Sequence, residues 1–249
     1  MKRKKSYIVG STLFIIAISL VIFGIHTLSK STGASFTTMF NPESSLNHTS
    51  STNEHPVNLP QLTNEVSKNE IEVHITTTLG LIKVKVFPDL APKAVENFIT
   101  HSKDGYYDET TFHRVLANFM IQGGDPKGDG TGGESIWGEP FETEISPQLF
   151  HIRGALAMAK TNAPVSIGSQ FYIVQNPVDV SASADPSTTP DDILEAYTSG
   201  GYPSLDQHYT VFGQVIEGMD VIDAISEIET DSLDKPLQEV KIESIEVID

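Results

Sequence analysis

From Glu70 onward the sequence consists mainly of short apolar runs separated by turn residues, and this pattern most constrains the fold. Such runs, bounded by glycine-rich turns, are typical of β-strands. Because only two helical patterns accompany them, they predict an all-β domain, a closed barrel capped by helices. The sequence shows no internal repeat. The runs between the two helical patterns are Phe112–Ile121, Ala155–Ala159, Phe171–Val174 and Thr210–Val215.

The first strands and helices can be placed along the chain. Apolar and polar residues alternate over Ile71–Ile75 and again over Ile82–Val86, which predicts a hairpin with Lys83 and Lys85 on its solvent face. The dipeptide Ala91-Pro92 then predicts a helix start, since proline suits the first helical turn, and Gly105 predicts its end.

The C-terminal part predicts one more helix and one more strand. Apolar residues in Gly218–Glu229 recur at helical spacing. A closing strand is expected over Gln238–Val247, but its apolar phase slips between Ile242 and Ile245. One extra residue in the strand, a β-bulge, would explain the slip.

The N-terminus predicts a membrane anchor. Residues 1–6 are a basic tail, and residues 7–28 form an apolar run that would span about 33 Å as a helix. The positive charges favour a cytoplasmic N-terminus with the rest of the chain exported. A cleaved signal peptide is the alternative, with a weak site at Thr32-Gly33-Ala34. The two outcomes are a single-pass membrane protein with an extracytoplasmic domain, or a secreted protein.

Residues 29–69 are rich in Ser, Thr and Asn, as expected of a flexible linker to a domain at 70–249.

The composition excludes several classes of function. Residues 31–249 hold 11 of the 16 basic residues and all 33 acidic ones. This acidic balance disfavours nucleic acid as a partner, because nucleic acid binding needs a cationic surface. Cysteine is absent, which excludes disulfides, thiolate nucleophiles and cysteine-based metal sites.

Other familiar chemistries also lack their residues. No serine has the surroundings of a hydrolase nucleophile, and the histidines lack metal-ligand spacing. No G-K-[ST] sequence follows the glycines of Gly123–Gly133 and no helix is signalled after them, so a tight irregular loop is expected there instead of a phosphate loop. What remains is Arg114, alone in the apolar stretch Phe112–Ile121. Such an arginine needs hydrogen bonds or a solvated cleft, and pairing with a nearby acid at a strand end is the structural alternative.

The stretch around this arginine resembles the cyclophilins, the peptidyl-prolyl isomerases inhibited by cyclosporin. The resemblance covers about 70–249 and implies an eight-stranded antiparallel barrel closed by two helices. It rests on Tyr107–Gly124 (YDETTFHRVLANFMIQGG), Gly130–Gly133 (GTGG), Ser135–Glu139 (SIWGE), Leu156–Ala159 (LAMA), Gly168–Ile173 (GSQFYI) and Val211–Met219 (VFGQVIEGM).

The resemblance implies a catalytic arginine and a proline-binding groove. Arg114 would donate a hydrogen bond to the prolyl nitrogen in the twisted transition state, and Gln122 would help to hold it. Neither a metal nor a cofactor would be required. The residues implied for substrate binding are His113, Phe119, Met120, Gln122, Ala159, Lys160, Gln170, Tyr172, Leu205 and Tyr209. For His113, structural hydrogen bonding is the preferred alternative to a direct role.

Several positions depart from the eukaryotic pattern. Asparagine, phenylalanine and histidine usually stand where this chain has Lys160, Tyr172 and Tyr209. The tryptophan of cyclosporin-sensitive members would align with Ser204, so weak cyclosporin inhibition is expected. The stretch 176–203 is longer than the corresponding loop, with helical character at Asp191–Tyr197. It is either a tolerated surface insertion or a rim that selects clients or binds a cation.

The expected function is to accelerate X-Pro isomerisation while exported proteins fold. The partners would be proline-containing polypeptides and, through the N-terminal helix, the membrane; a monomer is expected. The alternative is a low-turnover scaffold or chaperone module that binds proline peptides in the same groove.

Overall fold

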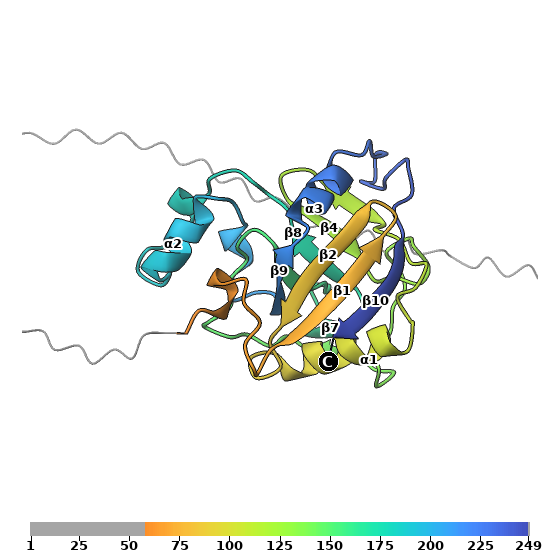
Figure 1. Cartoon of the computed structure of the whole chain (residues 1–249), viewed down its shortest axis with the longest axis horizontal. Helices are drawn as coiled ribbons and strands as arrows, with labels where there is room; N and C mark the ends of the chain where they lie inside the picture. The colour runs from red at the N-terminus through yellow and green to blue at the C-terminus, as the bar shows by residue number, and fades with distance from the viewer. Residues whose placement is uncertain (1–57, 249) are drawn as a thin grey trace, which may run out of the picture. The chain divides into compact units, whose positions relative to one another are not determined.

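A single antiparallel sheet dominates the computed structural model, which describes residues 58–248 (Figure 1). Its strand order is β10-β1-β2-β9-β6-β8-β4-β3. A second sheet pairs β5 (Phe141–Glu142) with β7 (Val165–Ile167). The strands of the large sheet are β1 (Ile71–Thr77), β2 (Gly80–Val86), β3 (Arg114–Leu116), β4 (Met120–Gly123), β6 (Ala155–Met158), β8 (Phe171–Val174), β9 (Val211–Glu217) and β10 (Ile242–Ile248).

The prediction of a closed eight-stranded barrel is wrong. Among the described residues the edge strands β3 and β10 do not pair, so the large sheet is a curled, open half-barrel. The reason lies beside β3, where the backbone N–H of Val115 is donated to the carbonyl of Asp234 (2.8 Å). A loop before β10 therefore occupies the place of a neighbouring strand. An isolated bridge between Thr111 and Lys241, with backbone hydrogen bonds such as that from the N–H of Phe112 to the carbonyl of Val240 (3.0 Å), joins the two sides of this seam without forming a strand pair within residues 58–248.

The described residues form three α-helices rather than the two that were predicted. α1 (Pro92–Lys103) and α3 (Met219–Ser226) lie at opposite ends of the sheet in Figure 1, whereas α2 (Asp191–Tyr197) lies to one side. Pro92 begins α1 as predicted, and the carboxylate of Glu144 accepts hydrogen bonds from two backbone N–H groups of its first turn. α2 confirms the helical character predicted within the insertion. Short 3-10 helices occur at Pro60–Leu62, Ser181–Ser183 and Pro203–Leu205.

The predicted hairpin and bulge are confirmed. β1 and β2 pair from Ile71 opposite Val86 to Thr77 opposite Gly80. In β10, Ser244 lies opposite Thr76 while Ile242 lies opposite Thr77, so the residue between them is the extra one.

The solvent-facing position predicted for Lys85 is wrong. Its side chain is fully buried, and its ammonium group donates to the carboxylate of Glu70 (3.1 Å) and to the carbonyl of Glu65 (2.8 Å). These partners come from residues 58–70, which pack on the outside of β2. The amide of Gln61 in the same segment binds the backbone carbonyl of Phe150 (2.9 Å). This part of the predicted linker therefore lies on the domain.

The large sheet has an apolar cluster on each face, because successive side chains of a strand point to opposite sides. One cluster contains Val115, Ile121 and Ile173 and includes Phe98 of α1. The other contains Met120 and Tyr172. The second cluster is covered by loops instead of α1, and it is the face that carries the predicted site.

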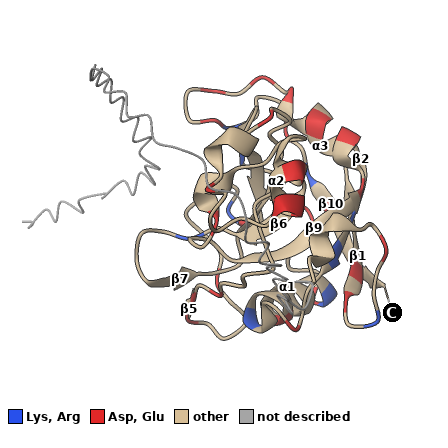
Figure 2. Cartoon of the chain, turned by 90° about the vertical axis from the view of Figure 1, so that its left-hand side faces the viewer, with Lys and Arg blue, Asp and Glu red and all other residues tan. Residues whose placement is uncertain are grey.

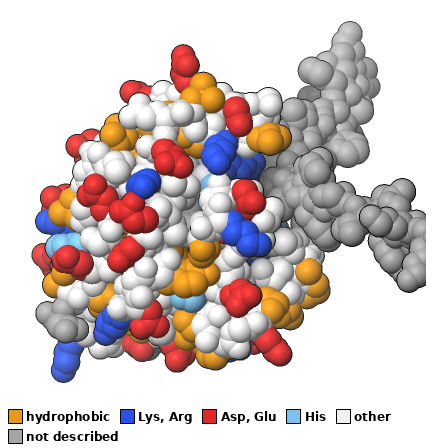
Figure 3. Space-filling model, turned by 90° about the vertical axis from the view of Figure 1, so that its right-hand side faces the viewer, with side chains coloured by type: hydrophobic (Ala, Val, Ile, Leu, Met, Phe, Trp, Pro, Cys, Tyr) orange, Lys and Arg blue, Asp and Glu red, His pale blue; other side chains and the backbone are white. Residues whose placement is uncertain are grey.

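The surface of the domain carries many carboxylates, as the acidic composition predicts. Figure 2 shows acidic segments on α2 and α3, and Figure 3 shows carboxylates spread over another face. Among residues 58–248 no helix is long and apolar enough to cross a bilayer. The predicted anchor at 7–28 and the first part of the predicted linker lie outside the described residues.

Candidate active site

Strand register brings the predicted polar residues into one row. Arg114 of β3 lies opposite Gln122 of β4, and Gln122 lies opposite Tyr172 of β8. Tyr172 in turn lies opposite Ala157 of β6. Directly opposed residues of antiparallel strands project from the same face. The arginine, the glutamine and the tyrosine therefore point to the same side of the sheet.

Apolar side chains predicted to hold a proline ring gather beside this row. Met120, Tyr172 and Leu205 are buried in one cluster, with Phe119, Ala159 and Tyr209 packed against it. Leu205 arrives from the 3-10 helix Pro203–Leu205, far from the others in sequence. All six predicted apolar and aromatic residues are thus brought together.

The guanidinium of Arg114 is fixed at one nitrogen. Its Nε lies 3.4 Å from a carboxylate oxygen of Asp234, and the side chain keeps 23% of its surface exposed. Within residues 58–248, Asp234 is the one hydrogen-bond partner recorded for this guanidinium. The pairing with a nearby acid that was considered from the sequence is therefore present. This pair uses the Nε–H of Arg114, which is one of the five N–H donors of a guanidinium group.

Gln122 connects the row to the glycine-rich loop. Its amide nitrogen donates to Gln170 (2.9 Å), whose own amide nitrogen donates to the carbonyls of Gly130 (3.2 Å) and Gly132 (2.7 Å). The fully buried carboxylate of Asp125 organises this loop by accepting backbone N–H groups, including that of Gly130 (2.7 Å). The expectation of a tight irregular loop is confirmed.

His113 lies beneath that loop and apart from the apolar cluster. A Cβ on Gly130 would lie 3.6 Å from its ring. The residue is 6% exposed, and neither ring nitrogen has a hydrogen-bond partner among the described residues. Burial lowers the pKa of His113, although Asp125 and Asp129 act against it. The imidazole is therefore neutral at pH 7.

Lys160 lies over an aromatic ring at the rim of the cluster. Its ammonium nitrogen is 4.9 Å from the ring centroid of Tyr209, a cation–π contact. The ring of Tyr209 meets that of Tyr172 edge to face at 6.2 Å. The three positions that depart from the eukaryotic pattern are thus in contact: Tyr172 contacts Tyr209, and Tyr209 contacts Lys160.

The hydroxyl group of Tyr172 has partners that sequence spacing did not predict. It lies 3.0 Å from Nε2 of His151, whose Nδ1 lies 2.9 Å from Asp206. The other oxygen of Asp206 accepts the hydroxyl of Tyr197 in α2. From the sequence, His151 was one of several histidines without recognisable spacing. The presence of Tyr172 where phenylalanine is usual could have indicated a partner such as His151, because a buried phenol needs a hydrogen-bond partner.

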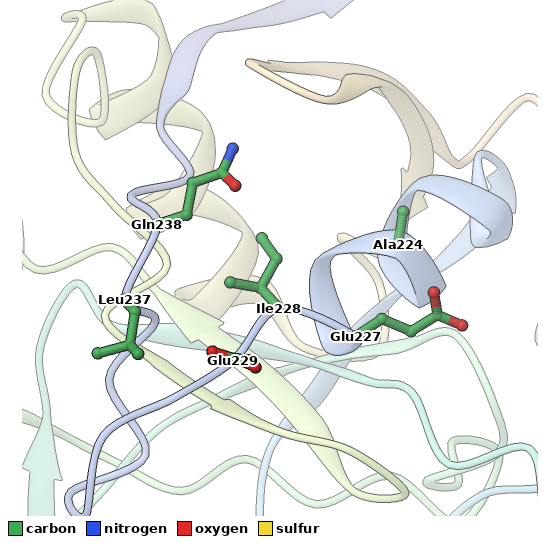
Figure 4. Close-up of a pocket in the computed structure, with 6 residues that line it drawn as sticks. All are labelled: Ala224, Glu227, Ile228, Glu229, Leu237 and Gln238. Carbon is green, nitrogen blue, oxygen red and sulfur yellow. The ribbon is translucent and has the colours of Figure 1, made fainter.

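A hollow of about 500 Å³ lies away from these residues (Figure 4). It is formed by the end of α3 and by the segment that returns toward β10. Glu227, Glu229 and Leu237 are among the residues that line it. None of the predicted site residues lines it.

One face of the curled antiparallel sheet thus carries an apolar cluster, covered by loops, beside an arginine. Comparison with known proteins identifies the class. Residues 72–247 match the family described as cyclophilin type peptidyl-prolyl cis-trans isomerase/CLD. The chain belongs to this family and is a peptidyl-prolyl cis-trans isomerase.

Individual relatives agree. A protein of Staphylococcus saprophyticus named as a peptidyl-prolyl cis-trans isomerase is 48% identical over 196 residues, which covers 77% of this chain and 99% of the relative. A protein of Staphylococcus epidermidis with the same description is 50% identical over 194 residues, covering 76% of this chain and 98% of the relative.

Solved structures show the same fold. A cyclophilin type isomerase of Cryptosporidium parvum is 34% identical with a TM-score of 0.60, covering 72% of this chain and 98% of the other. A second structure of that protein, determined in the presence of the dipeptide Ala-Pro, has the same identity and TM-score and covers 72% of this chain and 99% of the other.

Proposed function

We propose that Arg114 catalyses isomerisation by donating a hydrogen bond to the prolyl nitrogen in the twisted transition state. Rotation about an X-Pro bond is slow because it breaks amide resonance, whose barrier is about 18–20 kcal/mol. In the twisted state the nitrogen becomes pyramidal, and its lone pair can accept a hydrogen bond. A donor aimed at that atom stabilises the transition state more than either planar isomer, which is the condition for catalysis.

The observation that carries this proposal is the single row of Arg114, Gln122 and Tyr172 on one face of the sheet. A proline ring held against Tyr172 and Met120 would lie beside the arginine. Asp234 engages the Nε edge and restrains the orientation of the guanidinium. The relative determined with Ala-Pro supports a proline-containing peptide as the ligand.

A protease-coupled assay on a proline tetrapeptide tests the role of Arg114. Arg114→Ala should lower kcat about 100-fold with little change in KM, because the donor acts only in the transition state. Arg114→Lys should recover part of the loss, since lysine keeps a donor without the planar fork. Lys127→Ala, which removes an exposed cation from the nearby loop, is the matched control. An unchanged kcat in folded Arg114→Ala would rule out the mechanism.

We also propose that the domain works outside the cytoplasm, tethered by residues 7–28, on exported polypeptides. The support comes from the sequence: a basic tail, an apolar run of membrane-spanning length and an acidic remainder. Uncatalysed prolyl isomerisation takes tens to hundreds of seconds, so a newly exported chain would benefit from an isomerase near its exit.

A further inference from the structure

Four buried or half-buried side chains form one continuous chain of hydrogen bonds behind the apolar cluster. Its members, in order, are Tyr172, His151, Asp206 and Tyr197. His151 is 1% exposed, and Tyr172 and Tyr197 are 5% and 0% exposed. One end of the chain is therefore the pocket wall, and the other end lies in α2.

The direction of each hydrogen bond follows from the groups involved. The carboxylate of Asp206 only accepts, so it receives Nδ1–H of His151 and O–H of Tyr197. It also receives the backbone N–H of His151 (2.7 Å). In the neutral imidazole, Nε2 then accepts the hydroxyl hydrogen of Tyr172. Each member is satisfied only while its neighbour is in place, so a shift of Tyr197 is transmitted to Tyr172.

The insertion that carries Tyr197 is packed firmly on the domain. Tyr197 and Ile193 of α2 form a cluster with Phe150 and Ile152, the residues that flank His151. The backbone of Gly201 bridges Ile152 at the end of the insertion. This packing does not fit a loose surface insertion.

The far end of the insertion reaches the pocket directly. The ring of Tyr202 lies 4.4 Å from that of Phe119, centroid to centroid, and its N–H donates to the carbonyl of His151 (2.7 Å). Residues 176–203 thus contact both the pocket and the histidine behind it.

We infer that Asp206 and Tyr197 are positioning residues for the proline pocket, and that the insertion 176–203 supports the wall formed by Tyr172. This inference rests on the proposed function only in taking Tyr172 as the wall that contacts proline. The hydrogen-bond chain fixes the ring of Tyr172 in the position where it can cover a proline. Family members with phenylalanine at this place would lack the hydroxyl on which the chain ends.

Asp206, His151 and Tyr172 are hydrogen-bonded in the sequence acid, histidine, hydroxyl that also occurs in catalytic triads. The position of the Tyr172 hydroxyl does not suit a nucleophile. The hydroxyl of Tyr172 faces His151 in the interior, and burial raises its pKa well above 10. The phenol therefore stays neutral and serves as an anchor.

Steady-state kinetics on Tyr197→Phe and Asp206→Asn test the inference. Both variants keep side-chain shape; Tyr197→Phe removes one link, and Asp206→Asn weakens the two links that Asp206 holds. The wall binds ground state and transition state alike, so KM should rise at least threefold while kcat stays within twofold. Asp192→Asn, an exposed residue of α2, is the control and should match wild type. A KM rise below threefold in folded Tyr197→Phe, or a fall in kcat in its place, would overturn the inference.

A double variant tests the route. If the effect of Tyr197→Phe passes through the hydroxyl of Tyr172, it should disappear in a Tyr172→Phe background. Persistence of the full KM rise in that background would show that the hydrogen-bond chain is not the route.

Binding measurements separate this inference from the arginine mechanism. The Kd of an Ala-Pro peptide, measured by NMR titration, should rise at least threefold in Tyr197→Phe even if Arg114 proves dispensable for turnover. A Kd equal to that of wild type would overturn the inference while leaving the role of Arg114 intact.

Discussion

Buried histidines make the stability of this domain depend on pH at the scale of single residues. Burial lowers the pKa of His113 and of His151 below the usual 6.5. Asp125 and Asp129 oppose this shift at His113 while Arg114 adds to it; Asp206 opposes it at His151 while His208 adds to it. Well above pH 6.5 both rings are neutral in the folded and unfolded chains. Below it, the unfolded chain binds protons first, so the free energy of unfolding falls as pH falls through the folded pKa values.

We expect His113→Asn to flatten this dependence between pH 6.5 and 5. Each buried histidine contributes at most about 1.4 kcal/mol per pH unit, and His113 can be replaced without breaking a hydrogen bond recorded within residues 58–248. Urea unfolding at several pH values measures the effect, and Lys103→Gln, at an exposed position of α1, is the control. The carboxylates are the same in wild type and variant, so their contribution cancels in the comparison. Parallel curves for wild type and His113→Asn would contradict the prediction.

Much of the candidate site was predictable at this scale, because contiguous motifs carry it. Arg114, Phe119, Met120 and Gln122 lie within one recognisable stretch, and strand register then places them on one face. The pairing of His151 with Asp206 was not predictable. The two residues are 55 positions apart and meet only through the packing of the insertion.

At the scale of elements, the segment 58–70 is held to β2 by a buried ion pair. The side chain of Lys85 is fully buried, and that of Glu70 is 7% exposed. Among residues 58–248, Glu70→Ala would leave the buried ammonium group with one hydrogen-bond partner, the carbonyl of Glu65, and with the ring of Phe87 at 5.7 Å. We expect it to lower the free energy of unfolding by about 3 kcal/mol.

Matched variants distinguish a lost ion pair from a general effect of truncation. Lys85→Met combined with Glu70→Ala should restore most of the stability, because no buried charge remains. Glu96→Ala, at an exposed position of α1, should change it by less than about 0.5 kcal/mol. Chemical unfolding of the four proteins provides the comparison. A loss below 1 kcal/mol in Glu70→Ala would mean that water reaches Lys85.

Elements with strong local patterns were predictable, and those set by distant contacts were not. Alternating apolar and polar residues predicted the hairpin, Pro92 predicted the start of α1, and the slip in the apolar pattern predicted the bulge in β10. The open edge of the sheet depends on where Asp234 meets Val115, which no local pattern encodes. Lys85 was misplaced because alternation cannot reveal that residues 58–70 cover its face of the hairpin.

At the scale of the whole molecule, acidity and the N-terminal run make separate contributions to location. Carboxylates are spread over the faces seen in Figures 2 and 3, so the domain itself should be repelled by anionic lipid. Membrane attachment would then depend on residues 7–28 alone. An apolar anchor differs from electrostatic adsorption in its response to salt, because 1 M salt shortens the screening length to about 3 Å.

We therefore expect the full-length chain to stay in the membrane fraction after a 1 M salt wash, while a chain that starts at Asn58 stays soluble. Protease added to intact protoplasts should remove the domain, because the positive charges before residue 7 keep that end in the cytoplasm. Immunoblots of the membrane, soluble and medium fractions measure each outcome. A shortened protein in the medium would favour cleavage near Thr32-Gly33-Ala34 over anchoring. Full protection in intact protoplasts would contradict export itself, since an exported domain cannot be shielded by the membrane that it has crossed.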